Sequence, residues 1–218
     1  MSGDARRNGG DDGFTLIELL VAIAITGIVL GALTQVVIVF LRTSDQTTAR
    51  LIESRDAQVT SSYFGVDVAA IGTRDFTDAT SPVLKQSVEI GVANSGGLYP
   101  CGNSGTAAVR LVWDDVDKGP AIPDAAVITV TRVDYSAQLS TSGRFELHRL
   151  MCRGSSTPVS DIVVAHDLTV APSVVCDVTC IGSGGAVPAT VTMTLTSKDP
   201  LSRLAPISVS LIGQRRQS

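Results

Sequence analysis

The sequence predicts an α+β protein, in which one long N-terminal helix precedes an antiparallel β-sheet that packs on the helix's second half. Three observations lead to this class. Residues 19–41 are almost wholly apolar, apolar side chains recur at helical spacing over residues 42–72, and apolar and polar residues alternate beyond residue 72. A helix followed only by strands is typical of folds that bury one face of a sheet against a helix.

The first half of the predicted helix is long enough to cross a membrane. Between Leu19 and Leu41 the apolar run is interrupted only by Thr26, Thr34, Gln35 and two glycines. At about 1.5 Å per residue it spans roughly 35 Å, which matches the hydrocarbon core of a bilayer. We therefore expect a membrane helix over residues 14–41, preceded by a polar segment of residues 1–13.

The second half, residues 42–72, predicts a continuation of the helix with two different sides. Apolar residues at spacings of three, four and seven predict a stripe that packs against the chain's own head. Charged residues between them are expected to form the solvated face. The stripe comprises Ile52, Val59, Tyr63, Val66 and Ala70, and the charged residues are Arg42, Asp45, Arg50, Glu53, Arg55 and Asp56.

Beyond the helix, period-two alternation predicts a β-rich globular head over residues 73–218. Loop-like stretches, rich in glycine, proline and polar residues, separate the expected strands at 94–105, 114–123, 154–158 and 182–188. The expected strands are 88–92, 108–113, 126–135, 144–151, 162–170, 189–195 and 207–212, and those at 126–135 and 144–151 are expected to pair as a hairpin.

All four cysteines lie beyond the apolar segment, at Cys101, Cys152, Cys176 and Cys180. An even number of cysteines in an extracytoplasmic domain favours two disulfides. Cys176 and Cys180 can close a small loop, which leaves Cys101 to pair with Cys152. A zinc site is disfavoured because the spacing lacks paired C-x-x-C motifs.

Composition and motifs argue against catalysis and against nucleic-acid binding. The 218 residues carry a formal net charge of −4, so no basic surface for phosphates is expected. No P-loop, dinucleotide fingerprint, H-E-x-x-H motif or G-x-S-x-G elbow is present. The two histidines, His148 and His166, lie in or beside expected strands. We therefore expect neither an enzyme nor a bound cofactor.

One acidic cluster raises the alternative of a calcium site. Asp114, Asp115 and Asp117 supply the hard oxygen ligands that Ca²⁺ prefers. A polar turn leading into Gly119 and Pro120 is the favoured interpretation, and calcium remains the alternative.

Glu18 is the one charged residue inside the apolar N-terminal block. An ionised group at membrane depth costs about 2.5–3.5 kcal/mol on insertion scales, so it requires a partner. The pattern Thr15-x-x-Glu18 also fits a capping box at the start of the helix. Both roles are compatible.

Residues 13–20, Gly-Phe-Thr-Leu-Ile-Glu-Leu-Leu, resemble the cleavage and methylation motif of type IV pilins and type II secretion pseudopilins. The resemblance implies a leader of residues 1–13, cleavage between Gly13 and Phe14 by a prepilin peptidase, and N-methylation of Phe14. It also implies that the Glu18 carboxylate meets the Phe14 amine of a neighbouring subunit. That contact would neutralise two charges in a medium of low dielectric constant and set the register between subunits.

Residues at the end of the helix and in the following strands resemble one subgroup of this family. Tyr63-Phe-x-x-Asp67, followed by strands that end in Leu-His-Arg149, resembles the J-type minor pseudopilins and the corresponding minor pilins. A minor filament subunit is therefore expected, with other pilins or pseudopilins as partners. It would be anchored in the inner membrane with its head outside the cytoplasm, and would then enter a surface or periplasmic filament. A pilus and a secretion pseudopilus both remain open. The alternative from another class is an uncleaved single-pass receptor whose head binds a ligand or calcium.

Overall fold

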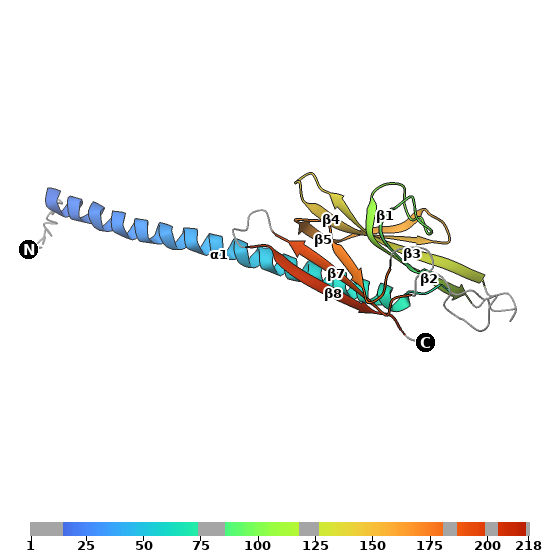
Figure 1. Ribbon diagram of the computed structural model, residues 1–218. Helices are drawn as coiled ribbons and strands as arrows, with labels where there is room; N and C mark the ends of the chain where they lie inside the picture. The colour runs from blue at the N-terminus through green and yellow to red at the C-terminus, as the bar shows by residue number, and fades with distance from the viewer. Residues whose placement is uncertain (1–14, 74–85, 118–126, 181–186, 199–204, 217–218) are drawn as a thin grey trace, which may run out of the picture. The chain divides into compact units, whose positions relative to one another are not determined.

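A computed structural model of the chain describes residues 15–73, 86–117, 127–180, 187–198 and 205–216. The helix α1 runs from Leu16 to Ala70 and precedes eight strands (Figure 1). The chain divides into two compact units, Met1–Thr47 and Thr48–Ser218. The second half of α1 therefore belongs to the same unit as the strands, here called the head.

The strands form one antiparallel sheet with the order β1-β2-β3-β4-β5-β7-β6, and β8 pairs with β7 (Figure 1). Consecutive strands from β1 to β5 are neighbours, and β3 and β4 form the expected hairpin. Their bounds are Val88–Ala93 for β1, Thr106–Asp117 for β2, Val127–Leu139 for β3, Phe145–Arg153 for β4, Pro158–Leu168 for β5, Ser173–Cys176 for β6, Thr190–Ser197 for β7 and Ile207–Gln214 for β8.

All seven expected strands are confirmed, and two details of the strand prediction were wrong. The short strand β6 was not expected. Asp114 to Asp117 were assigned to a loop, whereas they extend β2, where Asp117 pairs with Val127 of β3. Cross-strand pairing along a long two-stranded ribbon here overrides the weak strand propensity of aspartate.

The main core lies between the second half of α1 and one face of the sheet, called the inner face. Phe64 and Val68 of α1 are fully buried, and the Phe64 ring meets the Tyr135 ring edge to face at 5.6 Å between centroids. Because side chains alternate along a strand, Val133 and Tyr135 of β3 point to this face. At Gly213 of β8 an added Cβ would come within 2.5 Å of Val68, so glycine lets the strand approach the helix closely.

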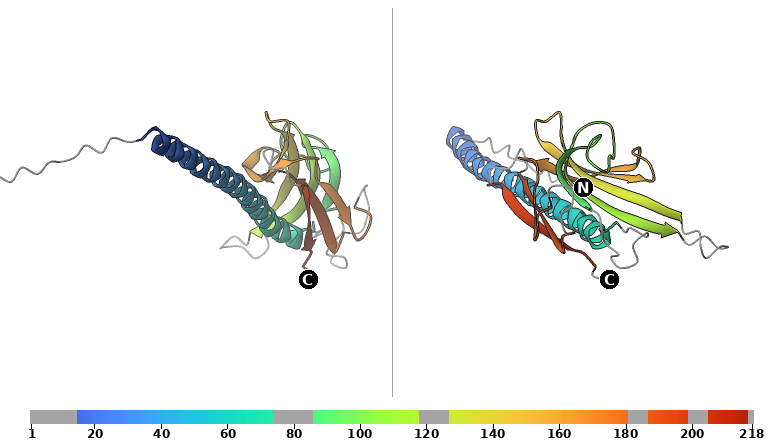
Figure 2. Two further views of the ribbon diagram at one scale, coloured as in Figure 1. Left: turned by 90° about the vertical axis from the view of Figure 1, so that its left-hand side faces the viewer. Right: turned by 45° about the vertical axis from the view of Figure 1, so that its right-hand side comes forward.

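The helix face predicted from the apolar stripe was the wrong one. Tyr63 and Val66 are 41% and 68% exposed, whereas their neighbour Phe64 is fully buried. The stripe that packs on the sheet contains more small and polar side chains, namely Ala49, Glu53, Asp56, Ala57, Thr60, Phe64, Asp67 and Val68. The prediction failed because two stripes of this helix carry apolar residues at helical spacing, and sequence spacing does not show which one meets the sheet. Figure 2 shows this half of α1 from two further directions.

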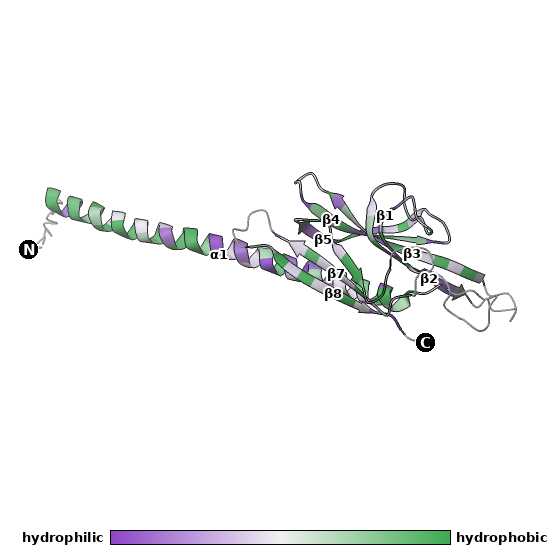
Figure 3. Cartoon of the chain, viewed as in Figure 1, coloured by the Kyte–Doolittle hydropathy of each residue, from purple (hydrophilic) through white to green (hydrophobic). Residues whose placement is uncertain are grey.

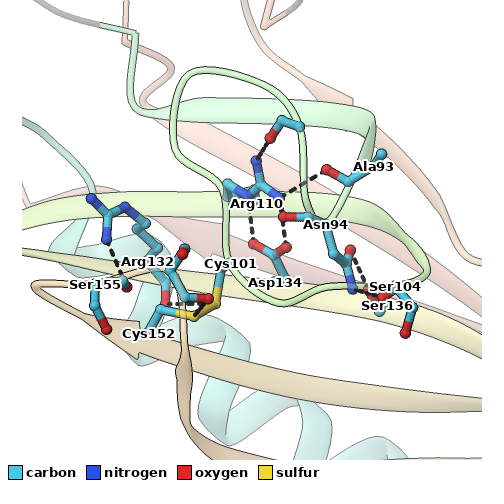
Figure 4. The surroundings of a disulfide bond; sticks show 12 residues. Ala93, Asn94, Cys101, Ser104, Arg110, Arg132, Asp134, Ser136, Cys152 and Ser155 are labelled. Carbon is cyan, nitrogen blue, oxygen red and sulfur yellow. Dashed lines mark hydrogen bonds and ion pairs between the residues drawn. A yellow bond between two sulfur atoms is a disulfide. The ribbon is translucent and has the colours of Figure 1, made fainter.

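The loop of residues 94–105 covers the part of the opposite, outer face that β2, β3 and β4 form. Cys101 in this loop is disulfide-bonded to Cys152 of β4, and both are fully buried with Leu150 beside them. Asn94 donates to the Ser104 carbonyl and accepts from the Ser136 hydroxyl. Figure 4 shows how the disulfide and these hydrogen bonds fix the loop on the strands.

Candidate functional site

At the start of α1, the candidate residue Glu18 takes part in a helix cap with Thr15. The Glu18 amide donates to the Thr15 carbonyl at 3.0 Å and lies 3.4 Å from the Thr15 hydroxyl oxygen. Thr15 therefore acts as the N-cap residue, and Glu18 is the acidic residue of the first turn. A carboxylate at this position is favoured by the partial positive charge of a helix N-terminus.

The apolar segment that follows Glu18 has no covering partner within the described chain. Every side chain from Leu16 to Leu41 is exposed, and Figure 3 shows this stretch mostly in green, the colour of hydrophobic residues, with pale and purple positions between. The Thr34 hydroxyl donates to the Leu30 carbonyl, so this polar group is satisfied inside the helix. The helix is long and apolar enough to cross a membrane. An apolar surface of this extent requires either lipid or other protein chains.

The other candidate site residues are distributed as follows. Gly13 and Phe14, the expected cleavage and methylation positions, lie outside the described residues. The cysteines pair as the spacing favoured, Cys101 with Cys152 and Cys176 with Cys180.

Two of the three aspartates considered for calcium, Asp114 and Asp115, do not converge. Asp114 and Asp115 are successive residues of β2, so their side chains point to opposite faces. Asp115 accepts from the Thr131 hydroxyl at 2.6 Å and from the Trp113 indole at 3.2 Å. No group of three potential metal-ligating side chains occurs among the residues that the structure describes. A calcium site at these residues stays a prediction.

A buried ionic clamp that the sequence did not reveal attaches α1 to the sheet. Asp67 of α1 accepts two hydrogen bonds from Arg149 of β4, at 2.7 and 2.8 Å, and one from the Tyr135 hydroxyl at 2.6 Å. Burial tends to lower the pKa of Arg149, but the Asp67 carboxylate reverses this and raises it. Burial, together with the nearby Asp67 charge, raises the pKa of Tyr135. The guanidinium of Arg149 therefore stays charged and the Tyr135 hydroxyl stays neutral. The guanidinium of Arg149 also lies 5.0 Å from the Tyr63 ring centroid.

A second buried network supports the loop of residues 94–105. Arg110 of β2 donates to Asp134 at 2.6 and 2.7 Å and to Glu89 at 2.9 Å. It also donates to three carbonyl oxygens of the chain around this loop, those of Ala93, Asn94 and Gly96. The triad of Glu89, Arg110 and Asp134 holds two carboxylates against one guanidinium. Burial raises the pKa of Asp134 to about 6, against the opposing effect of Arg110 and with a smaller contribution from Glu89.

This triad predicts a pH-dependent stability of the head. The folded-state pKa of Asp134 lies above its unfolded value, so the protonated carboxyl group stabilises the folded head. This contribution to the free energy of unfolding is complete below pH 4 and is lost as pH rises through about 6. From pH 5 to pH 7 we expect Asp134 to lower the free energy of unfolding by about 1 kcal/mol. Denaturation of the full-length chain, followed by the fluorescence of its single tryptophan, Trp113, measures this change. The variant Asp134→Asn should remove that part of the slope, and an unchanged slope would contradict the assignment.

Comparison with known proteins places the N-terminus in a defined class. Residues 10–34 match the family model of the prokaryotic N-terminal methylation motif. No curated protein and no solved structure matches the chain.

The matched stretch contains Gly13, Phe14 and Glu18 and covers residues 19–34 of the apolar segment. The chain therefore carries the N-terminal signature of type IV pilins and pseudopilins. The chain also has the α+β fold expected of a pilin-like subunit, with one long N-terminal helix and an antiparallel sheet.

Proposed function

We propose that the chain is a minor subunit of a type IV pilus or of a type II secretion pseudopilus. In this proposal a prepilin peptidase cleaves between Gly13 and Phe14, and the mature chain assembles with other subunits through α1. The observation that carries the proposal is the methylation motif at residues 10–34, continued without a break by a helix whose apolar side chains are all exposed up to Leu41. The signature is that of structural subunits, and we propose no reaction for the head.

Glu18 has a specific role in this proposal. Its position at the helix N-terminus, one turn inside the apolar segment, places a carboxylate where a free amine of another subunit can pair with it. An unpaired charge there is unfavourable in lipid, whereas an ion pair with Phe14 of a neighbour removes two unpaired charges together. The pair therefore favours one axial register between neighbouring subunits.

The proposal also implies where the chain lies before it is assembled. Before assembly, residues 14–41 would anchor it in the inner membrane. Arg6 and Arg7 favour a cytoplasmic position for the leader, although Arg42 weakly opposes that orientation. The disulfides suit a head on the oxidising side of the membrane.

Substitution of Glu18 tests the assembly role. In cells that produce the native filament, we expect Glu18→Val to lower the amount of chain in sheared filaments by at least about tenfold, which corresponds to 1.4 kcal/mol. The amount in the membrane and the cleavage of the leader should stay unchanged, because valine suits the apolar segment at least as well. Thr15→Val is the matched control, since it changes the cap and leaves the carboxylate. Filament incorporation of Glu18→Val at the wild-type level would contradict the proposed role.

The competing interpretation, an anchored receptor, predicts a different outcome. Such a chain would keep its N-terminus, would not enter filaments, and would not depend on Glu18 for any assembly.

A further inference from the structure

An apolar pocket lies at one end of the head's core. It has a volume of about 230 Å³ and opens between residues 49–57 of α1 and the strands β5, β7 and β8. Its apolar lining includes Leu168, Leu195 and Val209, the first two of which are buried core residues. The lining residues that the structure describes all belong to the unit Thr48–Ser218.

Three of the residues around the pocket are alanines, whose small side chains leave space that larger side chains would fill. Ala49 and Ala57 face it from α1, and Ala165 faces it from β5. Protein interiors are ordinarily packed as densely as organic crystals, so a space of this size loses contact energy unless something occupies it. A side chain that filled this space would restore those contacts.

The main charged groups around the pocket have partners within the protein. The Glu53 carboxylate pairs with Arg50 at 2.9 Å. Asp56 accepts from the His166 amide at 2.8 Å, and the same oxygen lies 3.0 Å from Nδ1 of the His166 ring. None of the buried polar atoms that lack a partner among the described residues belongs to a residue of the lining. The pocket therefore favours an uncharged apolar group.

Its size sets the dimensions of that group. An apolar cavity of about 150 Å³ is large enough to bind benzene. A pocket of about 230 Å³ therefore accepts one phenylalanine ring or one branched aliphatic side chain. It is too small for a typical drug-sized ligand, whose sites begin at about 300 Å³.

We propose that this pocket receives an apolar side chain from the N-terminal segment, residues 16–41, of a second copy of this chain. The inference rests on the proposed function, which brings such segments together, and adds a specific receptor for them on the head. Leu16 to Leu41 present exposed leucine, isoleucine, valine and phenylalanine side chains that need cover. The lining carries three carboxylates, those of Glu53, Asp56 and Asp167, and one guanidinium, that of Arg50. A lipid tail is disfavoured because this excess of negative charge repels anionic headgroups.

Site-specific photo-crosslinking of the full-length chain in its native cells identifies the occupant. The photoreactive residue p-benzoylphenylalanine replaces Ser54, which lines the pocket, or Ser62, an exposed serine of the same helix that does not. We expect the Ser54 adduct to exceed the Ser62 adduct several-fold and to contain a peptide from residues 14–41 of a second subunit. A lipid adduct at Ser54 would overturn the choice of occupant, and equal yields at the two positions would overturn the pocket as a binding site.

A filling variant provides the independent test. Ala57→Leu should occupy part of the pocket and lower the amount of chain in sheared filaments by about tenfold, equivalent to 1.4 kcal/mol. Its thermal midpoint, read from Trp113, should be unchanged or higher. Ser62→Leu adds the same side chain outside the pocket and should assemble normally. Equal assembly of Ala57→Leu and Ser62→Leu would overturn the inference. Absence of the wild-type chain from filaments would instead be a failure of the proposed function.

Discussion

Asp67→Ala is expected to lower the free energy of unfolding of the head by about 3–5 kcal/mol, since it leaves a buried charge without its partner. Arg149 is 8% exposed and gives both of its short hydrogen bonds to Asp67. The Tyr135 hydroxyl, also buried, would lose its acceptor. Thermal unfolding of the full-length chain in lipid nanodiscs, followed by Trp113 fluorescence, measures the loss. A shift of about 10 °C is expected for a unit of this size.

Two variants decide whether the effect belongs to the clamp. Asp45→Ala removes an exposed aspartate of the same helix and should change stability by less than about 0.5 kcal/mol. Replacement of both charged partners, as Asp67→Leu with Arg149→Met, should restore much of the loss, because no buried charge then remains unpaired. A loss of less than about 1 kcal/mol in Asp67→Ala would show that the clamp is not a principal attachment of α1 to the sheet.

Removal of the Cys101–Cys152 disulfide should have an effect of similar size. The bond spans a sequence separation of 51, and the loop-entropy relation gives about 4 kcal/mol for a loop of that length. It also fixes the loop of residues 94–105 over the outer face of the sheet, so its loss exposes the Arg110 network to water. Cys101→Ala with Cys152→Ala, unfolded chemically under the same conditions, measures the change.

The second disulfide is the matched control for this prediction. Cys176 and Cys180 are four residues apart, and the same relation gives only about 2 kcal/mol for their bond. The double alanine variant at 176 and 180 should therefore be the more stable of the two. If removal of the short-loop disulfide were the more damaging change, the assigned role of the Cys101–Cys152 bond would be wrong.

Much of the fold was predictable because its signals are local. The period of two in the strands, the membrane-length apolar run and the cysteine spacing each depend on residues close in sequence. The helix end was also readable, since α1 stops at Ala70, just before Gly72. The backbone of Gly72 has a φ of 137°, a conformation that favours glycine.

The orientation of α1 could not be predicted in the same way. Ile52, Tyr63 and Val66 give a more apolar stripe than the one that faces the sheet. The stripe that packs on the sheet is stabilised by long-range contacts. In two of them, the Thr60 hydroxyl donates to the Val164 carbonyl and Asp67 pairs with Arg149 in a buried contact. Spacing along one helix carries no information about partners that lie about a hundred residues away.

The candidate site also combines features that are local in sequence with features that depend on long-range contacts. Thr15 and Glu18 were identified from eight consecutive residues, because the motif, the cap and the apolar run are contiguous. The pocket depends on Ala57 of α1 and Ala165 of β5, which become neighbours only when the sheet folds onto the helix. Alanines in a sequence give no sign that a space will remain between them.

The central claim, that the chain is processed as a prepilin, is tested most directly by the mass of its N-terminal peptide. The protein is purified from its native membrane, in cells with an active prepilin peptidase. We expect a chain that begins at Phe14 and carries one added methyl group on its amine. A chain that still begins at Met1 or Ser2 would contradict the account and make the anchored receptor the leading interpretation.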